Sequence, residues 1–386
     1  MQVSAPSERT LVHVTTVPMT LLFLRGQPRW FTERGYAVHA ISSSGPELQE
    51  FAASEPVRVH AVEMPRRITP LADLRALARV VSVLRRIRPD IVHAHTPKGG
   101  LLGMIAARLA GVRKRVYHVH GLPFVTRSGW RRRLLTTTEW ISCTLATDVL
   151  CVSHGVARQL VEDGLCAPER ARVLAGGSIN GVDAQRFKPS DPSARRAART
   201  RLGLPPEGPV GGYVGRLATE KGIRELAAAW RVVSERHPDA RLLLVGPVED
   251  NDPVPTEVLE ALRRDPRVRM HGADWNTPPL YAAMDVVVLP SYREGLPVVP
   301  LEASAAGVPV ISSDIPGSRE AVADGISGLL VPPRDEGALA GALERYLGDP
   351  DLAARHGTEA RRRAVELFSP ERIRGELLEV YEGTRG

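Results

Sequence analysis

The feature that most constrains the fold is a repeated alternation of short apolar runs with amphipathic segments. The run Val286–Leu289, between Asp285 and Pro290, is continuous in the way that is typical of a buried parallel strand. Residues 71–87 instead have apolar side chains at helical spacing, which predicts one buried helix face. That predicted face carries Leu74, Leu77, Val80, Val81 and Leu84. Strands that alternate with helices indicate an α/β fold with parallel sheets.

The alternation occurs twice along the chain. In the first half we expect strands at residues 11–16, 36–42, 57–64, 91–95, 115–120 and 148–153, a loop at 19–26, and helices at 27–34, 71–87, 99–110 and 130–146. After a polar linker at 190–208, we expect strands at 210–214, 241–245, 268–270, 286–289, 310–312 and 329–331, with a helix at 222–236. The sequence therefore predicts two doubly wound, Rossmann-like domains, residues 1–189 and 190–368, followed by a last segment at 369–386. Its helix has Ile373, Leu377, Leu378 and Tyr381 in register.

Composition places the chain among globular proteins of a reducing compartment. Of the 386 residues, 43% are hydrophobic and 25% are charged, and no apolar run reaches the about 18 residues of a membrane-spanning helix. The first residues lack the basic-then-apolar order of a secretion signal. The three cysteines form no close pair in the sequence, which argues against a disulfide framework or a cysteine zinc site. We expect a cytoplasmic protein, with a peripheral position at the inner face of the cell membrane left open.

Positive charge is concentrated in the first half. Residues 1–185 hold 24 Lys and Arg against 14 Asp and Glu, although the whole chain has a net charge of only +7. Such a balance suits nucleic acid, anionic lipid or phosphorylated substrates, or reflects a solvated arginine-rich surface. Aromatic residues make up 5% of the chain and are not interleaved with the basic ones, which disfavours a nucleic-acid-binding protein. The run Trp130–Leu135, WRRRLL, could rest on an anionic membrane or pack into the first domain.

The stretch 291–310 carries the main functional signal, and its pattern predicts a strand end, a tight loop at Glu294 and Gly295, a helix that ends at Gly307, and a strand. Glu294 and Glu302 are eight residues apart, which on a helix is about 12 Å along the axis and nearly the same face. Carboxylates that far apart cannot share a proton, but they can hold the two ends of a hydroxyl-rich ligand. The free N–H groups of a helix N-terminus between them favour a phosphate. The pattern predicts a binding site for a nucleotide-sugar. The alternative is that Glu294 only caps the helix and Glu302 is solvated on its surface.

A second loop adds two cations to this region. Arg216 and Lys221 follow the predicted strand at 210–214 and precede a helix. A guanidinium and an ammonium on one loop suit a diphosphate, and they would stabilise charge on a leaving nucleotide. The alternative is a surface salt bridge to Glu220.

With these motifs in place, the chain resembles glycosyltransferase family 4, of the GT-B fold. The resemblance is carried by GYVGRLATEKG, by Glu294 and Glu302, and by SDIPGSREAVADGISGLLVPPRD. The first half agrees through HAHTPKGGLLG, YHVHGLPF and SINGVDAQRFKP, which are similar to the bacterial subgroup that builds capsule, O-antigen or other glycans on a lipid carrier. The resemblance implies two facing domains, a last helix that crosses back to the first, and a retaining, metal-independent transferase with no cofactor besides its nucleotide-sugar.

The resemblance also implies roles for residues of the second domain. Arg216 and Lys221 would bind the donor diphosphate. Glu302 would hold the ribose hydroxyls and Glu294 would contact the transferred sugar, with a catalytic role. Around the phosphates and the sugar we expect Gly295, Leu296 and Pro297. A UDP-linked donor is expected from the subgroup, with an N-acetylhexosamine as the weaker inference.

On the first domain, the resemblance places His120 near the reaction centre. It precedes Gly121 at the carboxyl end of a strand, where ligands bind in open α/β sheets. A structural role remains open, as does a role for His118 or His93. Gly26 would let backbone approach a ligand, although the frequent paired glycine is here Arg25-Gly26. Lys98 either meets an acceptor phosphate or is a solvated loop lysine.

Other functions stay open on the sequence alone. A nucleotide-sugar epimerase can share the architecture, and the acceptor could be a soluble small molecule rather than a lipid-linked glycan. A dinucleotide dehydrogenase is disfavoured because no G-x-G-x-x-G follows a predicted strand. Asp250-Asn251-Asp252 spells a two-aspartate metal motif, but it lies in an acidic, proline-rich segment that we expect to be a surface loop. We therefore expect no metal site.

Overall fold

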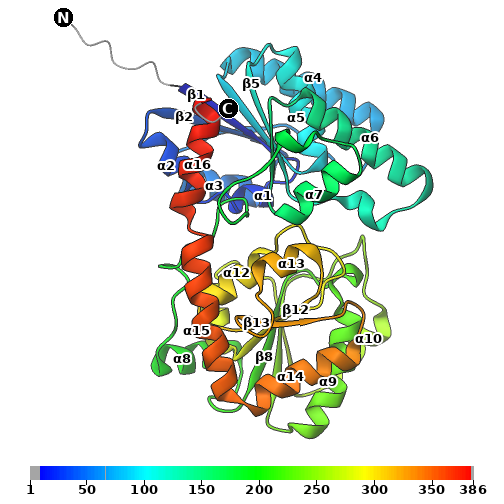
Figure 1. The fold of residues 1–386 in the computed structure, drawn as a ribbon, viewed down its shortest axis with the longest axis vertical. Coiled ribbons are helices and arrows are strands. Elements are labelled where there is room, and N and C mark those ends of the chain that lie inside the picture. The colour runs from blue at the N-terminus through cyan, green and yellow to red at the C-terminus, as the bar shows by residue number, and fades with distance from the viewer. Residues whose placement is uncertain (1–8, 66, 384–386) are drawn as a thin grey trace, which may run out of the picture. The chain divides into compact units, whose positions relative to one another are not determined.

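The computed structural model describes residues 9–65 and 67–383, which form two compact units. Unit 1 contains the chain up to Asn180 together with the segment from Glu371 onward, and unit 2 runs from Gly181 to Pro370. The boundaries proposed from the sequence were residues 189 and 368. Both units are α/β, with one wholly parallel sheet each (Figure 1).

The sheet of unit 1 has the strand order β3-β2-β1-β4-β5-β6-β7. Its direction of growth reverses between β1 and β4, the point at which open α/β sheets bind ligands. The strands are β1 (Arg9–Val14), β2 (Tyr36–Ser42), β3 (Arg58–Ala61), β4 (Ile91–His95), β5 (Lys114–Val119), β6 (Asp148–Cys151) and β7 (Ala171–Val173). The helices are α1 (Met19–Leu22), α2 (Gln27–Thr32), α3 (Pro46–Ser54), α4 (Pro70–Ile87), α5 (Pro97–Leu109), α6 (Gly129–Leu145) and α7 (His154–Glu162).

Helix α4 is amphipathic as the sequence predicts, but its fully buried residues are only partly the predicted ones. Ala76, Val80 and Leu84 are buried, which is an i, i+4 row along one face. Leu74 is two residues from Ala76, about 200° around a helix, and its side chain is 66% exposed. The assignment of Leu74 to the buried face was therefore wrong.

The sheet of unit 2 has the order β10-β9-β8-β11-β12-β13, with its reversal between β8 and β11. The strands are β8 (Val210–Val214), β9 (Arg241–Val245), β10 (Val268–Gly272), β11 (Val286–Leu289), β12 (Val310–Ser313) and β13 (Gly328–Val331). The helices are α8 (Pro192–Leu202), α9 (Ile223–Arg236), α10 (Thr256–Arg264), α11 (Pro278–Ala283), α12 (Val298–Ala305), α13 (Pro316–Ala321), α14 (Glu336–Gly348) and α15 (Pro350–Leu367).

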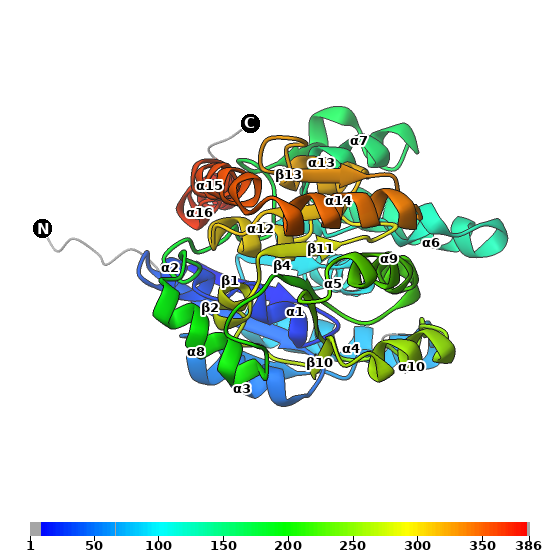
Figure 2. The same cartoon turned by 90° about the horizontal axis from the view of Figure 1, so that it is seen from below.

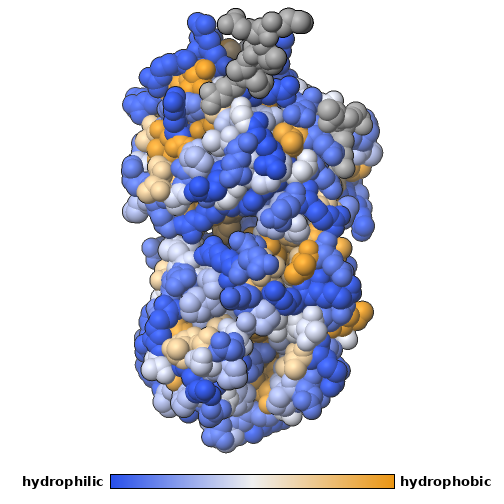
Figure 3. Space-filling view, turned by 90° about the vertical axis from the view of Figure 1, so that its left-hand side faces the viewer, coloured by the Kyte–Doolittle hydropathy of each residue, from blue (hydrophilic) through white to orange (hydrophobic). Residues whose placement is uncertain are grey.

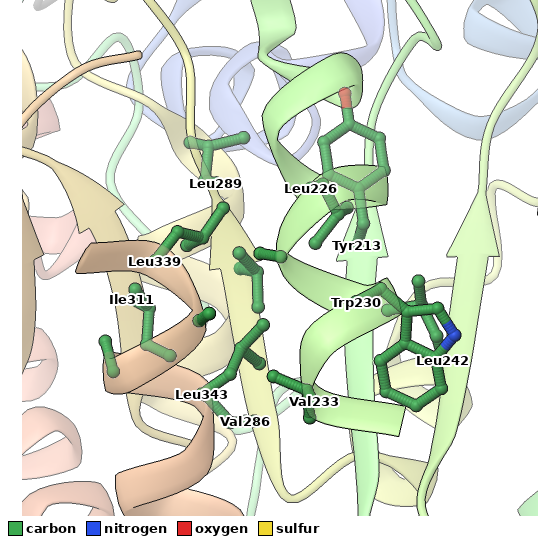
Figure 4. Close-up of a cluster of buried hydrophobic side chains, with 14 of the residues drawn as sticks. Tyr213, Leu226, Trp230, Val233, Leu242, Val286, Leu289, Ile311, Leu339 and Leu343 are labelled. Carbon is green, nitrogen blue, oxygen red and sulfur yellow. The ribbon is translucent and has the colours of Figure 1, made fainter. Parts of the chain in front are cut away.

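The core of unit 2 lies where α9 and α14, packed against each other, cover one face of the sheet (Figure 2). Trp230 of α9 and Leu343 of α14 meet strand residues such as Leu242 and Val286 in one buried cluster (Figure 4). Burial of such side chains contributes about 25 cal/mol per Å² of apolar area. The cluster therefore holds the strands whose ends carry the candidate site.

The polar linker expected at 190–208 is in fact a helix, α8. Asp191 caps its first turn by accepting hydrogen bonds from the backbone of Ser193 and Ala194, and Gly203 ends it at a positive φ of 69°. One arginine of this arginine-rich segment is buried rather than solvated: Arg199 is only 1% exposed. Its guanidinium is 2.9 Å from the Asp285 carboxylate and also donates to three backbone carbonyls.

The expected loop at 19–26 likewise contains α1, and α3, α7 and β7 were not predicted.

The last helix, α16 (Pro370–Glu382), packs within unit 1. Leu377, Val380 and Tyr381 are buried against Leu11 and Phe31, as the apolar register of the segment predicts. None of the helices in the described part of the chain is long and apolar enough to cross a bilayer. Hydrophilic residues dominate the face drawn in Figure 3, with apolar ones in small groups.

Candidate functional site

The predicted donor residues of unit 2 lie on loops that leave adjacent strands. Arg216 and Lys221 follow β8, and Glu294 follows β11, the two strands between which the sheet changes direction. This edge, beyond the carboxyl ends of the strands, is where doubly wound sheets bind ligands. The topology therefore brings residues that are far apart in the sequence to one expected binding position.

Two glycines permit the close approach of these loops. Gly222 ends the β8 loop at a φ of +71°, and a Cβ there would lie 2.1 Å from the carbonyl oxygen of Pro290, at the end of β11. A Cβ on Gly317, in α13, would lie 2.3 Å from the carbonyl oxygen of Gly295. Side chains at either position would push the loops apart, so glycine is needed for the local geometry.

The central contact of the site is an ion pair. The Lys221 ammonium lies 2.6 Å from Oε1 of Glu294, and the two side chains are only 17% and 13% exposed. Such a charge-assisted bond between partly buried groups is stronger than a surface salt bridge. It gives the site one cation and one carboxylate in fixed positions.

Arg216 is held by two carboxylates. Its guanidinium pairs with Glu249 and, at 3.1 Å, with Glu220, which also pairs with Arg293 at 2.9 Å. The sequence alternative of a bridge to Glu220 is thus present in the structure. Hydrogen bonds from Asn251, with a further contribution from Arg216, lower the pKa of Glu249 to about 2. Neither Glu249 nor Arg293 was predicted as a site residue, although Arg293 directly precedes Glu294 in the stretch 291–310.

The Asp250-Asn251-Asp252 loop supports this network. Asn251 donates a 2.9 Å hydrogen bond to Glu249, and the Asp252 carboxylate accepts one of 2.7 Å from the backbone N–H of Glu220. The polar side chains of this loop therefore hold Glu249 and Glu220, the two residues that pair with Arg216.

Glu302 lies on α12 and is joined to α11. The hydroxyl of Tyr281 donates to Oε2 of Glu302 at 2.7 Å, and Thr277 supplies a second hydrogen bond. Burial raises the pKa of Glu302 to about 7, although both hydrogen bonds act in the opposite direction. No sequence pattern distinguishes Tyr281, because a buried tyrosine in a short helix is common in cores.

Glu294 does not share a helix with Glu302. Helix α12 begins at Val298, with Pro297 as the residue before it, so Glu294 lies in the preceding loop. The loop predicted at Glu294 and Gly295 is therefore confirmed, whereas the spacing of about 12 Å, which assumed one helix through both carboxylates, is wrong. Gly295 is half-buried in the same loop, and Leu296 and Pro297 are buried.

In unit 1, His120 ends a row of histidines on neighbouring strands. Nε2 of His120 lies 3.1 Å from Nδ1 of His95, and Nε2 of His95 lies 3.1 Å from Nδ1 of His13. His93 and His118 belong to the same buried cluster, and Nδ1 of His93 is 2.6 Å from the Tyr381 hydroxyl. Burial lowers the pKa of His120 to about 3, so its imidazole is neutral at physiological pH.

The two weaker candidates of unit 1 are both engaged. Gly26 has a φ of +77°, its N–H donates to the Glu55 carboxylate at 2.6 Å, and a Cβ there would lie 2.9 Å from the guanidinium of Arg374. Lys98 pairs with Asp73 at 2.6 Å and donates to the carbonyl of Arg67 at 2.6 Å. Lys98 therefore fastens the segment before α4 rather than extending freely into solvent.

Comparison with known proteins gives matches along nearly the whole chain. Residues 194–363 match the family profile of glycosyl transferases group 1, and residues 23–177 match a glycosyl transferase 4-like domain. The capsular polysaccharide biosynthesis glycosyltransferase CapM of Staphylococcus aureus is 29% identical over 371 residues, which cover 96% of each chain. The UDP-Gal:alpha-D-GlcNAc-diphosphoundecaprenol alpha-1,3-galactosyltransferase of Escherichia coli is 30% identical over 74% of each chain. Anabaena HepE, crystallised with UDP-glucose, has a TM-score of 0.81 at 23% identity, over 97% of this chain and 99% of its own.

Proposed function

The chain belongs to the group 1 glycosyltransferases of GT-B fold, within the bacterial polysaccharide subgroup, and from that premise we propose how it transfers sugar. The donor is a nucleotide-sugar bound by unit 2. The acceptor is a lipid-linked glycan bound by unit 1, and transfer retains the anomeric configuration without a metal ion.

One observation carries this assignment: the Lys221–Glu294 ion pair at the reversal point of the unit 2 sheet. A diphosphate needs fixed positive charge, and a sugar needs hydrogen-bond acceptors beside it. In the proposal, Lys221 binds the diphosphate with Arg216, and Glu294 accepts hydrogen bonds from hydroxyls of the sugar. The loop of Gly295, Leu296 and Pro297 surrounds the junction between phosphate and sugar.

Glu302 is assigned to the ribose of the donor. Its carboxylate lies on the helix that follows the Glu294 loop, and Tyr281 and Thr277 fix its orientation. An ionised carboxylate can accept two ribose hydroxyl hydrogen bonds while keeping the bond from Tyr281. This arrangement supports recognition of the nucleoside end of the donor.

The reaction breaks the bond between the anomeric carbon and the phosphate oxygen and forms a bond from that carbon to an acceptor hydroxyl oxygen. Negative charge develops on the leaving diphosphate, where Lys221 and Arg216 stabilise it. We assign the role of nucleophile to neither carboxylate: Glu294 accepts hydrogen bonds from sugar hydroxyls, and Glu302, which accepts from Tyr281, holds the ribose. We therefore assign attack from the face of the leaving group, whose phosphate accepts the acceptor proton. That path retains configuration and uses side-chain cations where other enzymes use a metal.

The acceptor side is assigned to the edge of unit 1 that carries His120, Lys98 and Gly26. Neutral His120 would position an acceptor hydroxyl by hydrogen bonding. A UDP donor and a lipid-linked acceptor are supported by the name of the E. coli relative, which specifies both. An anionic membrane surface is a further expected partner, because Trp130 is 69% exposed and Arg131, Arg132 and Arg133 that follow it are exposed.

A panel of nucleotides tests the proposal first. UDP and UDP-sugars should raise the melting temperature of the purified protein, since a ligand that binds only the folded state stabilises it. The best donor should then label an undecaprenyl-diphosphate glycan, with product that depends on both substrates. Conversion of the donor without any acceptor would point instead to an epimerase. Stabilisation by no nucleotide would contradict the assignment of the unit 2 site.

A further inference from the structure

Tyr292 joins the two loops of unit 2 that carry the donor residues, and the transfer reaction itself gives it no role. Its backbone N–H donates to the carbonyl oxygen of Glu220 at 2.9 Å. Glu220 directly precedes Lys221 in the sequence, and Tyr292 lies two positions before Glu294. The main chain is therefore fastened next to both members of the ion pair that the donor displaces.

The side chain of Tyr292 is anchored on helix α9. Its hydroxyl lies 2.8 Å from each carboxylate oxygen of Glu225, to which it donates. Glu225 belongs to the first turn of α9 and is only 8% exposed. Hydrogen bonds to a carboxylate are stronger than bonds between neutral groups. The loop after β11 is therefore fixed to a helix as well as to the loop after β8.

A cation from a third segment covers the face of the Tyr292 ring. The guanidinium carbon of Arg334, in the loop between β13 and α14, lies 4.5 Å from the ring centroid. An aromatic face attracts a cation within about 6 Å of its centroid. Three segments of unit 2 thus converge on one side chain beside the donor loops.

Arg334 has a backbone conformation that arginine rarely adopts. Its φ is +65°, and among the described residues of unit 2 it is the only one other than glycine with a positive φ. Glycine adopts this conformation freely, whereas a residue with a Cβ is strained there. Strained residues persist where the surrounding structure fixes them, and they cluster at functional sites. The alternative is an ordinary turn whose exposed arginine has no part in the reaction.

We propose that Tyr292 is a positioning residue for the donor loops. Glu225 and Arg334 hold its side chain from two segments, and the ring in turn keeps Glu294 in place against Lys221 during transfer. This inference rests on the proposed function, which assigns the sugar to Glu294 and the diphosphate to Lys221. A displacement of about 1 Å at a group that acts in the transition state can lower the rate by about 100-fold. Loss of positioning should therefore lower kcat more than it weakens binding of a nucleotide that lacks the sugar.

Arg334→Gly separates the two explanations, because it removes the cation and also relieves the backbone strain. The variant should remain folded, yet its kcat for sugar transfer should fall by about tenfold. KM for the donor and the affinity for free UDP should change by less than about twofold, since UDP lacks the sugar that Glu294 contacts. Arg334→Lys keeps a cation over the ring and should recover part of the rate. The matched control is Arg88→Gly at the end of α4, an exposed arginine with a φ of +55°, which should keep full kcat.

Tyr292→Phe keeps the ring under Arg334 but removes the hydroxyl that bonds Glu225, and it should lower kcat as well. The double variant with Arg334→Gly should lose less than the product of the two single effects, because both act through one ring. Full kcat in Arg334→Gly, an equal loss in Arg88→Gly, or a loss confined to UDP affinity would overturn this inference alone. Absence of transfer by the unmodified chain would overturn the proposed function and this inference with it.

Discussion

The Lys221 ammonium and the Glu294 carboxylate are 2.6 Å apart, although 73 positions separate them in the sequence. Each is therefore the other's counter-ion within the same partly buried site. In the proposed mechanism, a diphosphate that binds Lys221 competes with Glu294, which is then released toward the sugar. The ion pair keeps both groups in place and makes their roles dependent on each other.

Replacing Lys221 by alanine should lower kcat/KM for the donor by about 10²–10³-fold, the usual effect of removing one group that stabilises a developing anion. The affinity for the free nucleoside diphosphate should fall as well, because the same charge binds the product. Steady-state kinetics and titration calorimetry with UDP measure the two effects. Lys188→Ala, which removes an exposed lysine of the same unit, is the control and should match the unmodified protein. Unchanged UDP affinity in Lys221→Ala would exclude the proposed contact.

Donor affinity should depend on pH through Glu302, whose pKa is raised to about 7 by burial. The ionised carboxylate accepts ribose hydrogen bonds better than the acid, so UDP affinity should rise between pH 6 and pH 8. Stability should change in the opposite direction. A folded-state pKa above the usual 4.5 contributes stability that is complete below pH 4.5 and is lost as pH rises toward 7, by at most about 1.4 kcal/mol per pH unit.

Two variants isolate this effect. Tyr281→Phe removes a hydrogen bond that lowers the pKa of Glu302, so the midpoint of the affinity profile should move to higher pH. Glu302→Gln should flatten the profile and weaken UDP binding at pH 8. A midpoint that stays in place in Tyr281→Phe would show that another group governs the profile.

How far the sequence predicts the site depends on the kind of signal. Parallel strands were located well because a buried strand needs a continuous apolar run, and Val210–Val214 and Val286–Leu289 agree residue by residue. The last helix was predicted from its period, which Tyr381 and Leu377 confirm by their burial. The observed strand order places β8 beside β11, which brings Lys221 near Glu294.

What the sequence could not provide depends on contacts between distant segments. Arg199 looks like one of many surface arginines, and only its ion pair with Asp285 shows why it is buried. Glu302 was found by motif, but Tyr281, which orients it, has no local signature. The histidines were noticed singly, whereas their clustering arises from the register of β1, β4 and β5.

Transfer should continue in excess chelator, because Lys221 and Arg216 are proposed to supply the positive charge that a metal would supply. EDTA at millimolar concentration should leave the initial rate within about twofold, and added magnesium or manganese should not raise it. The control is a manganese-dependent glycosyltransferase assayed in parallel. A rate that collapses in chelator and returns with manganese would contradict the metal-independent mechanism.

Arg199→Ala should destabilise unit 2 by about 1–3 kcal/mol, the usual cost of leaving buried polar groups unpaired, because Asp285 keeps its ion pair with Arg195. The substitution leaves the carbonyls of Ala283 and Gly208 without their donor. Arg196→Ala, on the exposed side of the same helix, should change stability by no more than about 0.5 kcal/mol. Urea unfolding of the two variants measures the difference, and equal midpoints would mean that α8 does not anchor the sheet.

Membrane association should depend on the start of α6. Arg131 and Arg133 are exposed beside Trp130, whereas Arg132 pairs with Asp163 at 2.8 Å. Each basic residue near an anionic surface contributes about 1 kcal/mol. Arg131→Gln with Arg133→Gln should therefore weaken binding to vesicles containing phosphatidylglycerol by about 30-fold, and Trp130→Ser should weaken it further by removing the exposed indole.

The matched control removes two exposed arginines of unit 2, Arg231 and Arg263, and so changes the net charge equally. Sedimentation with vesicles, repeated at rising salt, separates the two cases, because attraction to an anionic surface weakens as salt screens it. Equal loss in both double variants would indicate a general charge effect rather than a docking site on α6. Binding that is as strong to neutral vesicles would contradict the electrostatic part of the proposal.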